Sequence, residues 1–341
     1  MLTDKKIQEI TKELLEESFY KYFISAQKET KHIILDRFFP KERRITSTMT
    51  GLQTSLGTFW EKLSVKLAKE NNISTLDNSC LVKPKTIPVD LQSLINDIKN
   101  LREKNGGELT QFKIDLNNKF ALNKQPKCEY EQMVKGKGAD VILKKGNNIY
   151  LFDIKTVQVN ANSGNSFNET VILWTAFYKY MYGINANNIK AMLVFPYNSA
   201  NENNDEAWWR DFGGRVSPLT NKDVFVGNEY WSFLSDNTNA LKQIISAIEE
   251  LNKDKAFKDL YQKVFEVEDR SGLVEFSEEV RLHRIKSKFN IELLSNESPW
   301  NLRKKFKWRH NGNCEFNERL NKLLKSNSYK CTSCNTYLEK V

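Results

Sequence analysis

The stretch from Gly138 to Thr156 constrains the fold more than any other part of the chain. It contains two largely apolar, strand-like runs, 139–145 and 149–155. Gly146-Asn147-Asn148 lies between them, and these are the residue types that a tight turn between antiparallel strands needs. The sequence therefore predicts a β-hairpin here.

Hydrophobic periodicity on both sides of this hairpin predicts several helices and one more strand. One or two helices are expected within 4–29, and others at 59–70, 90–104, 170–182, 230–234 and 239–251. Gly106 and Gly107 would end the helix at 104, a polar turn is expected at 40–44, and 189–195 is expected to be a buried strand ended by Pro196. This order of helices and strands predicts a mixed α/β fold.

Asp140, Asp153 and Lys155 are the side chains of the hairpin that carry chemistry. Side chains of a strand alternate between its faces, so Asp153 and Lys155 project from one side. Asp140 begins the partner strand and can lie beside Asp153. Two carboxylates placed so close repel each other, and a bound divalent cation offsets the repulsion. The trio therefore predicts a Mg²⁺ site for phosphodiester hydrolysis, in which Lys155 orients water or neutralises developing charge.

The same residues resemble a known nuclease signature. Asp140 followed by Asp153-Ile154-Lys155 is similar to the PD-(D/E)xK motif, with Gly138-Ala139-Asp140 where Pro-Asp is expected. Two further segments, 51–61 and 152–156 followed by Leu173-Trp174, resemble Type II restriction endonucleases of the TdeIII type. The resemblance covers about residues 32–235. Without it, a solvent-facing Asp-x-Lys pair on an ordinary strand would be the simpler interpretation.

The resemblance implies a restriction-endonuclease-like core, in which a mixed central sheet is flanked by helices. It implies that Glu61, on the first core helix, faces the same metal ion as Asp140 and Asp153, although a helical glutamate beside a lysine is more often a surface residue. Residues that leave the strand would contact DNA, or would simply be polar loop residues; they are Thr156, Gln158 and Asn160. The substrate would be a short site in double-stranded DNA, cut by a homodimer that is paired with a cognate DNA methyltransferase.

Charge is distributed unevenly along the chain. The formal net charge is +9, and residues 281–341 carry 14 Lys and Arg against 5 Asp and Glu, so the first 280 residues are close to neutral. A neutral body with a basic tail suits a polyanionic partner such as DNA, and a solvated charged tail is the alternative. We therefore expect a catalytic domain with an N-terminal helical segment at 1–280 and a basic DNA-binding module at 281–341.

Basic side chains that are expected to reach DNA fall in two places. In the tail, basic residues alternate with aromatic residues, a pattern that suits phosphate contacts with some stacking. These basic residues are Arg303, Lys304, Lys305, Lys307 and Arg309. Arg210 and Arg215 belong to a segment that is expected to be a polar loop able to reach a DNA groove. The clusters of aromatic residues between 174 and 233 are expected to form core rather than to stack on bases.

The five cysteines are unevenly spaced, which argues against a disulfide framework. Two of them have the C-x₂-C spacing of a zinc knuckle, and a third cysteine and a histidine could complete a Cys₃His site for structural Zn²⁺. The four residues are His310, Cys314, Cys331 and Cys334. Cys128 or His283 could replace His310, and free thiols or a redox pair are the alternatives to zinc. Cys80 is expected to be an incidental thiol.

Composition sets the remaining limits. Hydrophobic residues make up 40% of the chain and charged residues 28%, as in an average globular protein. No apolar run approaches the ~20 residues of a membrane span, and the N-terminus lacks a signal-peptide core, so we expect a cytoplasmic protein. The predicted function is a Mg²⁺-dependent Type II restriction endonuclease. The alternatives are a structure-selective or repair nuclease with the same core, and a catalytically idle DNA-binding protein.

Overall fold

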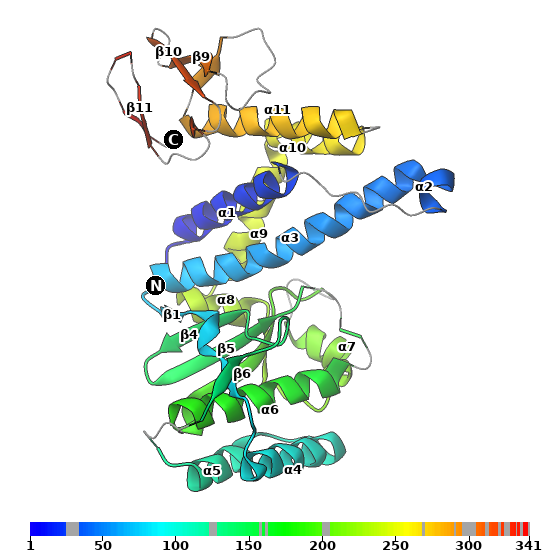
Figure 1. Ribbon diagram of the computed structural model, residues 1–341, viewed down its shortest axis with the longest axis vertical. Coiled ribbons are helices and arrows are strands. Elements are labelled where there is room, and N and C mark those ends of the chain that lie inside the picture. The colour runs from blue at the N-terminus through cyan, green and yellow to red at the C-terminus, as the bar shows by residue number, and fades with distance from the viewer. Residues whose placement is uncertain are drawn as a thin grey trace. The chain divides into compact units, whose positions relative to one another are not determined.

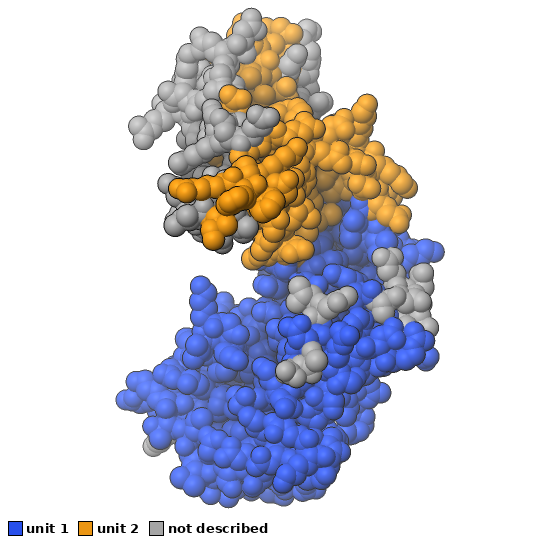
Figure 2. Space-filling model, turned by 90° about the vertical axis from the view of Figure 1, so that its right-hand side faces the viewer, with its two compact units in different colours: residues 1–14, 57–248 blue, residues 15–56, 249–341 orange. Residues whose placement is uncertain are grey.

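The computed structural model (Figure 1) describes residues 1–24, 34–122, 128–156, 159–160, 163–199, 205–267, 270–289, 291–294, 305–310, 314–319, 322–323, 328–331, 333–334 and 337–339. The chain forms two compact units (Figure 2), of which the first comprises residues 1–14 and 57–248 and the second 15–56 and 249–341. The domain boundary expected from charge, at residue 280, falls inside the helix α11 (Arg270–Phe289) and stays a prediction.

A five-stranded mixed sheet forms the centre of the first unit (Figure 1). Its strands are β1 (Ser74–Leu76), β4 (Val141–Lys145), β5 (Asn148–Ile154), β6 (Ile189–Phe195) and β7 (Val224–Val226), in that order across the sheet. β1, β4 and β5 pair antiparallel, whereas β6 pairs parallel to β5 and β7 parallel to β6. The predicted mixed α/β fold is therefore confirmed for this unit.

The predicted hairpin is formed by β4 and β5. Val141 lies opposite Phe152, and the pairing runs down to Lys145 opposite Asn148. Gly146 has a φ of 60°, which is the left-handed conformation that a tight turn needs and that glycine adopts without steric cost. The turn therefore fixes the register that brings the start of β4 beside the end of β5.

Helices cover both faces of this sheet (Figure 1). On one face, α6 (Ser163–Tyr182) packs on β6, α4 (Val89–Asn105) packs on α6, and α5 (Thr110–Lys119) packs on α4. On the other face lies α8 (Asn228–Ser235), whose Tyr230 ring packs edge-on against Phe152. Trp174, Trp208 and Tyr230 are all buried, so the expectation that these aromatic clusters form core is confirmed.

The remaining elements of the first unit include α7 (Asp205–Val216), most of α9 (Ala240–Lys253) and a small antiparallel pair, β2 (Val82–Pro84) with β3 (Tyr130–Gln132). The helices predicted at 90–104, 170–182, 230–234 and 239–251 and the strand at 189–195 are all present. α1 (Asp4–Ile24) confirms the first predicted helix, and α1, α3 (Pro40–Glu70) and α9 contribute residues to both units.

The polar turn expected at 40–44 is wrong, because α3 begins at Pro40 and continues through the predicted helix at 59–70. Proline is tolerated in the first turn of a helix, where its missing N–H would have no intrahelical partner. Gly51 lies inside α3, and a Cβ added there would come within 2.6 Å of the Tyr22 hydroxyl oxygen. That hydroxyl donates a hydrogen bond to the Thr48 carbonyl at 2.7 Å, so the glycine allows α1 and α3 to pack closely.

The second unit contains α2 (Leu35–Phe38), α10 (Lys255–Gln262), α11 and two small sheets. One sheet has the order β10-β9-β8, and the other pairs β11 with β12. The strands are β8 (Ile291–Leu293), β9 (Lys305–His310), β10 (Cys314–Arg319), β11 (Ser328–Lys330) and β12 (Tyr337–Glu339). Within the described ranges, no helix combines the length and the apolar character needed to cross a membrane.

Candidate active site

Asp140 stands at the start of β4 and is held on three sides. Its backbone N–H donates to the Phe152 carbonyl at 2.8 Å, and its own carbonyl accepts from Nδ2 of Asn78 at 2.7 Å. Its carboxylate Oδ2 accepts from the Ile154 N–H at 2.7 Å. Hairpin pairing therefore fixes the backbone and the Ile154 amide fixes the side chain, next to the strand end that carries Asp153.

Asp153 and Lys155 lie where β5 ends. Asp153 is 9% exposed, and its Oδ1 lies 2.6 Å from Nζ of Lys155. The Lys155 backbone N–H donates to the Val194 carbonyl at 2.8 Å, so the parallel pairing with β6 continues one residue past β5. Nζ of Lys155 also lies 5.8 Å from the centre of the Phe167 ring of α6. Two strands and one helix thus position this pair.

Glu61 approaches the hairpin from α3. It is half-buried, and burial raises the pKa of its carboxyl above the ordinary value while Lys62 lowers it. Its charge acts on Asp140, which places the carboxylates of Glu61, Asp140 and Asp153 in one neighbourhood. The helix α3 and the strands β4 and β5, which are distant from that helix in sequence, therefore contribute to one acidic cluster.

The electrostatics of Asp140 reflect this crowding. Burial is the largest influence and raises the pKa of its carboxyl to about 7. The hydrogen bond from the Ile154 amide opposes the rise, the negative charges of Asp153 and Glu61 add to it, and the positive charge of Lys155 lowers it. Three carboxylates with one ammonium group form an oxygen donor set that a hard divalent cation such as Mg²⁺ prefers.

The segment after Lys155 borders a cavity. The Thr156 carbonyl accepts a hydrogen bond from the Tyr197 hydroxyl at 3.0 Å. Lys155, Thr156 and Tyr197 line this cavity of ≈ 230 Å³ together with the aromatic rings of Trp208 and Phe212. Asn160 is exposed, and its carbonyl accepts from the Ser163 N–H at 3.0 Å. Gln158, also expected to contact DNA, lies outside the described residues, and DNA contact by Thr156 and Asn160 stays a prediction.

The polar loop expected around Arg210 and Arg215 is wrong, because both residues belong to the helix α7. Trp208 and Phe212 lie four residues apart and are both buried, so the segment has an apolar helical face that the glycines at 213 and 214 obscured. Arg210 pairs with Asp211 at 3.0 Å, and Arg215 donates to the Val159 carbonyl at 3.3 Å. Both side chains are exposed, and their contact with DNA stays a prediction.

The basic residues of the tail are only partly described. Arg303 and Lys304 lie outside the described residues, and Lys305 is described only as the first residue of β9. Lys307 and Arg309, which also lie on β9, both pair with Glu315 on β10, at 2.5 and 2.9 Å. Their charges are therefore partly neutralised within the protein.

The histidine and cysteines expected to bind zinc lie together in the second unit. The potential ligand atoms of His310, Cys314, Cys331 and Cys334 all lie within 4.8 Å of one another. Cys128 and His283, weighed as alternatives to His310, are not part of this group. Cys80 is half-buried in the first unit.

Sequence reasoning missed the residues that hold the site in place. Asn78 fixes the carbonyl of Asp140, and Trp174 Nε1 donates to the Lys137 carbonyl at 2.9 Å in the segment that leads to Asp140. Tyr197 holds the carbonyl of Thr156. These residues lie between 37 and 62 positions from their partners, and nothing in local spacing links them. The one available signal is that Tyr197 follows a buried strand that ends at proline.

Comparison with protein-family models places residues 3–252, about three quarters of the chain, in the class of the Type II restriction endonucleases. The particular family is HinfI, and the chain belongs to it. It is therefore a site-specific deoxyribonuclease that acts on double-stranded DNA. Comparisons with curated proteins and with solved structures gave no match. The predicted class is confirmed against the two alternatives, whereas the likeness to TdeIII enzymes stays a prediction.

Proposed function

We propose that the cluster of Glu61, Asp140, Asp153 and Lys155 is the site at which this restriction endonuclease hydrolyses phosphodiester bonds. The observation that carries the proposal is the convergence of three carboxylates from α3, β4 and β5 beside the ammonium group of Lys155. The strand pair followed by α6 and the parallel strand β6 supports a PD-(D/E)xK core. Asp140, Asp153 and Lys155 take the motif positions, and Glu61 takes the position on the first core helix.

The donor set supports Mg²⁺ as the cofactor, with Asp140, Asp153 and Glu61 as its ligands. When bound, the ion would lower the pKa of a coordinated water and polarise the phosphodiester. The Ile154 amide holds the Asp140 carboxylate in a fixed orientation, and β5 places Asp153 and Lys155 side by side. The Lys155 ammonium would orient the attacking water or neutralise charge that develops on the phosphate.

We expect the active enzyme to be a homodimer. A twofold-symmetric protein matches a palindromic DNA site, and each protomer would then cut one strand. The expected functional partner is a DNA methyltransferase of the same recognition sequence, which protects the host DNA in the cytoplasm. Sedimentation of the protein with and without its DNA site tests whether it is a dimer. A methyltransferase gene next to the gene of this protein would support the expected partner.

Substitution of the carboxylates tests the proposed site. Asp153→Ala and Asp140→Ala should each abolish Mg²⁺-dependent cleavage of unmethylated phage DNA, because the ion loses a ligand. Folding, and DNA binding in Ca²⁺, should remain close to wild type. Asp97→Ala is the matched control, because Asp97 is an exposed carboxylate on α4. Full cleavage by either site variant would remove that residue from the proposed site.

A further inference from the structure

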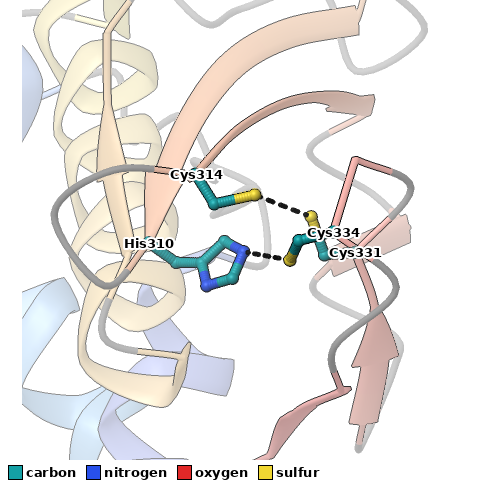
Figure 3. Close-up of side chains that lie close together, drawn as sticks. All are labelled: His310, Cys314, Cys331 and Cys334. Carbon is teal, nitrogen blue, oxygen red and sulfur yellow. Dashed lines mark hydrogen bonds between the residues drawn. The ribbon is translucent and has the colours of Figure 1, made fainter.

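Two β-hairpins of the second unit present cysteine and histidine side chains to each other (Figure 3). His310 is the last residue of β9 and Cys314 the first residue of β10, so both stand at the turn of the first hairpin. Cys331 directly follows β11, and Cys334 lies between β11 and β12, so both stand at the turn of the second. Each turn therefore contributes two of the four side chains.

Two of the distances between these side chains match those of a tetrahedral zinc centre. Sγ of Cys314 lies 3.7 Å from Sγ of Cys331, and Sγ of Cys334 lies 3.4 Å from Nε2 of His310. Zn–S bonds of about 2.3 Å and Zn–N bonds of about 2.0 Å place two sulfurs about 3.8 Å apart, and a sulfur and a nitrogen about 3.5 Å apart. A disulfide would need about 2.0 Å between sulfurs, so Cys314 and Cys331 are not oxidised to each other.

We infer that His310, Cys314, Cys331 and Cys334 bind one structural Zn²⁺. Three thiolates and one imidazole form a soft donor set, which selects zinc over the hard Mg²⁺ of the proposed cleavage site. Four protein ligands complete a tetrahedron and leave no open position for water or substrate, so the ion is structural. The four residues lie beyond the segment that matches the HinfI family, and the inference does not depend on the proposed active site.

The ion would join two parts of the fold that share no backbone pairing among their described residues. β9 and β10 belong to one sheet and β11 and β12 to another. The contacts between them include a hydrogen bond of 2.9 Å from the Tyr329 hydroxyl to Glu318, and the Phe316 and Tyr329 rings stack 5.4 Å apart. Cys331 itself belongs to the small buried cluster that these rings form with Trp308. Because a core of this size stabilises a fold weakly, zinc ligation would supply much of the folding free energy here.

Metal content and spectroscopy of the full chain test the inference without reference to cleavage. Protein purified without chelators should contain one zinc per chain by elemental analysis. Replacement of the zinc by Co²⁺ should give the intense thiolate-to-cobalt charge-transfer band and the visible bands of a tetrahedral centre. The cobalt spectrum needs no substitution, so it remains decisive even if a variant fails to fold.

Substitutions then assign the ligands. Cys331→Ser with Cys334→Ser should lose the zinc and become susceptible to proteolysis after residue 270. Cys80→Ser with Cys128→Ser is the matched control, because both thiols lie outside the cluster, and it should keep one zinc. His310→Cys should keep the zinc as a four-thiolate site, whereas His310→Ala should bind it more weakly.

Two results would overturn the inference. One is a wild-type chain that carries no zinc, even after reduction and incubation with Zn²⁺, and that shows no thiolate-to-cobalt band. The other is zinc that remains at one ion per chain in the Cys331→Ser, Cys334→Ser protein, because the ion would then be bound elsewhere.

Discussion

The carboxylate of Asp140 is held in an unfavourable place. One backbone amide donates to it, while Asp153 and Glu61 add negative charge nearby and Lys155 forms its ion pair with Asp153. A group held this way is more stable when protonated, which is why its pKa is raised to about 7. The charged carboxylate therefore lowers the stability of the folded protein, and the same crowding of negative charge favours the binding of a cation.

Neutralising Asp140 should therefore stabilise the metal-free protein. The folded pKa lies above the unfolded value near 3.9, so stability is lost as the pH rises from about 4 through 7, and the loss is complete at pH 8. Asp140→Asn keeps an acceptor for the Ile154 amide and carries no charge. In EDTA at pH 8, we expect it to raise the free energy of unfolding by about 1 to 3 kcal/mol and to abolish cleavage in Mg²⁺.

Thermal unfolding from pH 4.5 to 8 measures this effect. The gain in Tm over wild type should shrink as the pH falls, because wild-type Asp140 then becomes neutral as well. Asp97→Asn should show no such trend, since Asp97 is exposed on α4. A gain that is constant with pH would contradict the electrostatic origin. Mg²⁺ should raise the Tm of wild type and not that of Asp140→Asn.

Part of the candidate site could be predicted from the sequence because it is local. Asp140, Asp153 and Lys155 lie on one hairpin, and strand alternation with a tight turn is enough to bring them together. Glu61 required the resemblance, because nothing in the chain shows which strand a helix 79 residues before Asp140 will approach. The supporting contacts of Asn78 and Tyr197 are long-range, so the sequence did not indicate them.

Element length decided which parts of the fold could be predicted. β5, β6, α4 and α6 are long enough to show their periodicity and were expected from it. β1 and β7 have three residues each, which is too short for a periodic signal. They are the two edge strands of the sheet and pair with the longer strands β4 and β6. Two adjacent glycines near the end of α7 indicate a loop, although the same segment has the apolar face of a helix.

Replacement of two helical glycines by alanine should change the stability of the protein in opposite directions. A Cβ at Gly164, in the first turn of α6, would lie 1.8 Å from the Ser217 carbonyl oxygen, so Gly164→Ala forces the backbone apart. We expect a loss of about 1 to 3 kcal/mol in the free energy of unfolding. Gly57, within α3, has open space around its Cβ position, so Gly57→Ala should gain up to about 1 kcal/mol from helix propensity. Urea unfolding of the two variants measures both effects, and a stable Gly164→Ala protein would mean that α6 does not approach Ser217 so closely.

At the scale of the whole molecule, the family match and the basic tail do not coincide. The match ends at residue 252, whereas the excess of positive charge begins near 281. The basic tail therefore lies outside the matched segment, and pairing of Lys307 and Arg309 with Glu315 partly neutralises its positive charge.

The contribution of Lys307 and Arg309 to DNA affinity can be measured from the salt dependence of binding. Each phosphate contact contributes roughly −0.9 to the slope of log K against log salt. Lys307→Gln with Arg309→Gln should therefore make the slope shallower by up to about 1.8, and by less where Glu315 retains part of the charge. Lys119→Gln, on α5, is the control and should leave the slope unchanged. An equal slope for the double variant and wild type would show that neither Lys307 nor Arg309 contacts DNA.

The hairpin turns that hold the proposed zinc ligands follow the central sheet in chain order, and this has a consequence for synthesis in the cell. Residues 57–248 leave the ribosome before residues 310–334, and domains generally fold in that sequence. The sheet and its acidic cluster can thus mature before any zinc is captured. In a cell starved of zinc, the chain would accumulate with a folded nuclease core and an open segment downstream, which proteases would trim first.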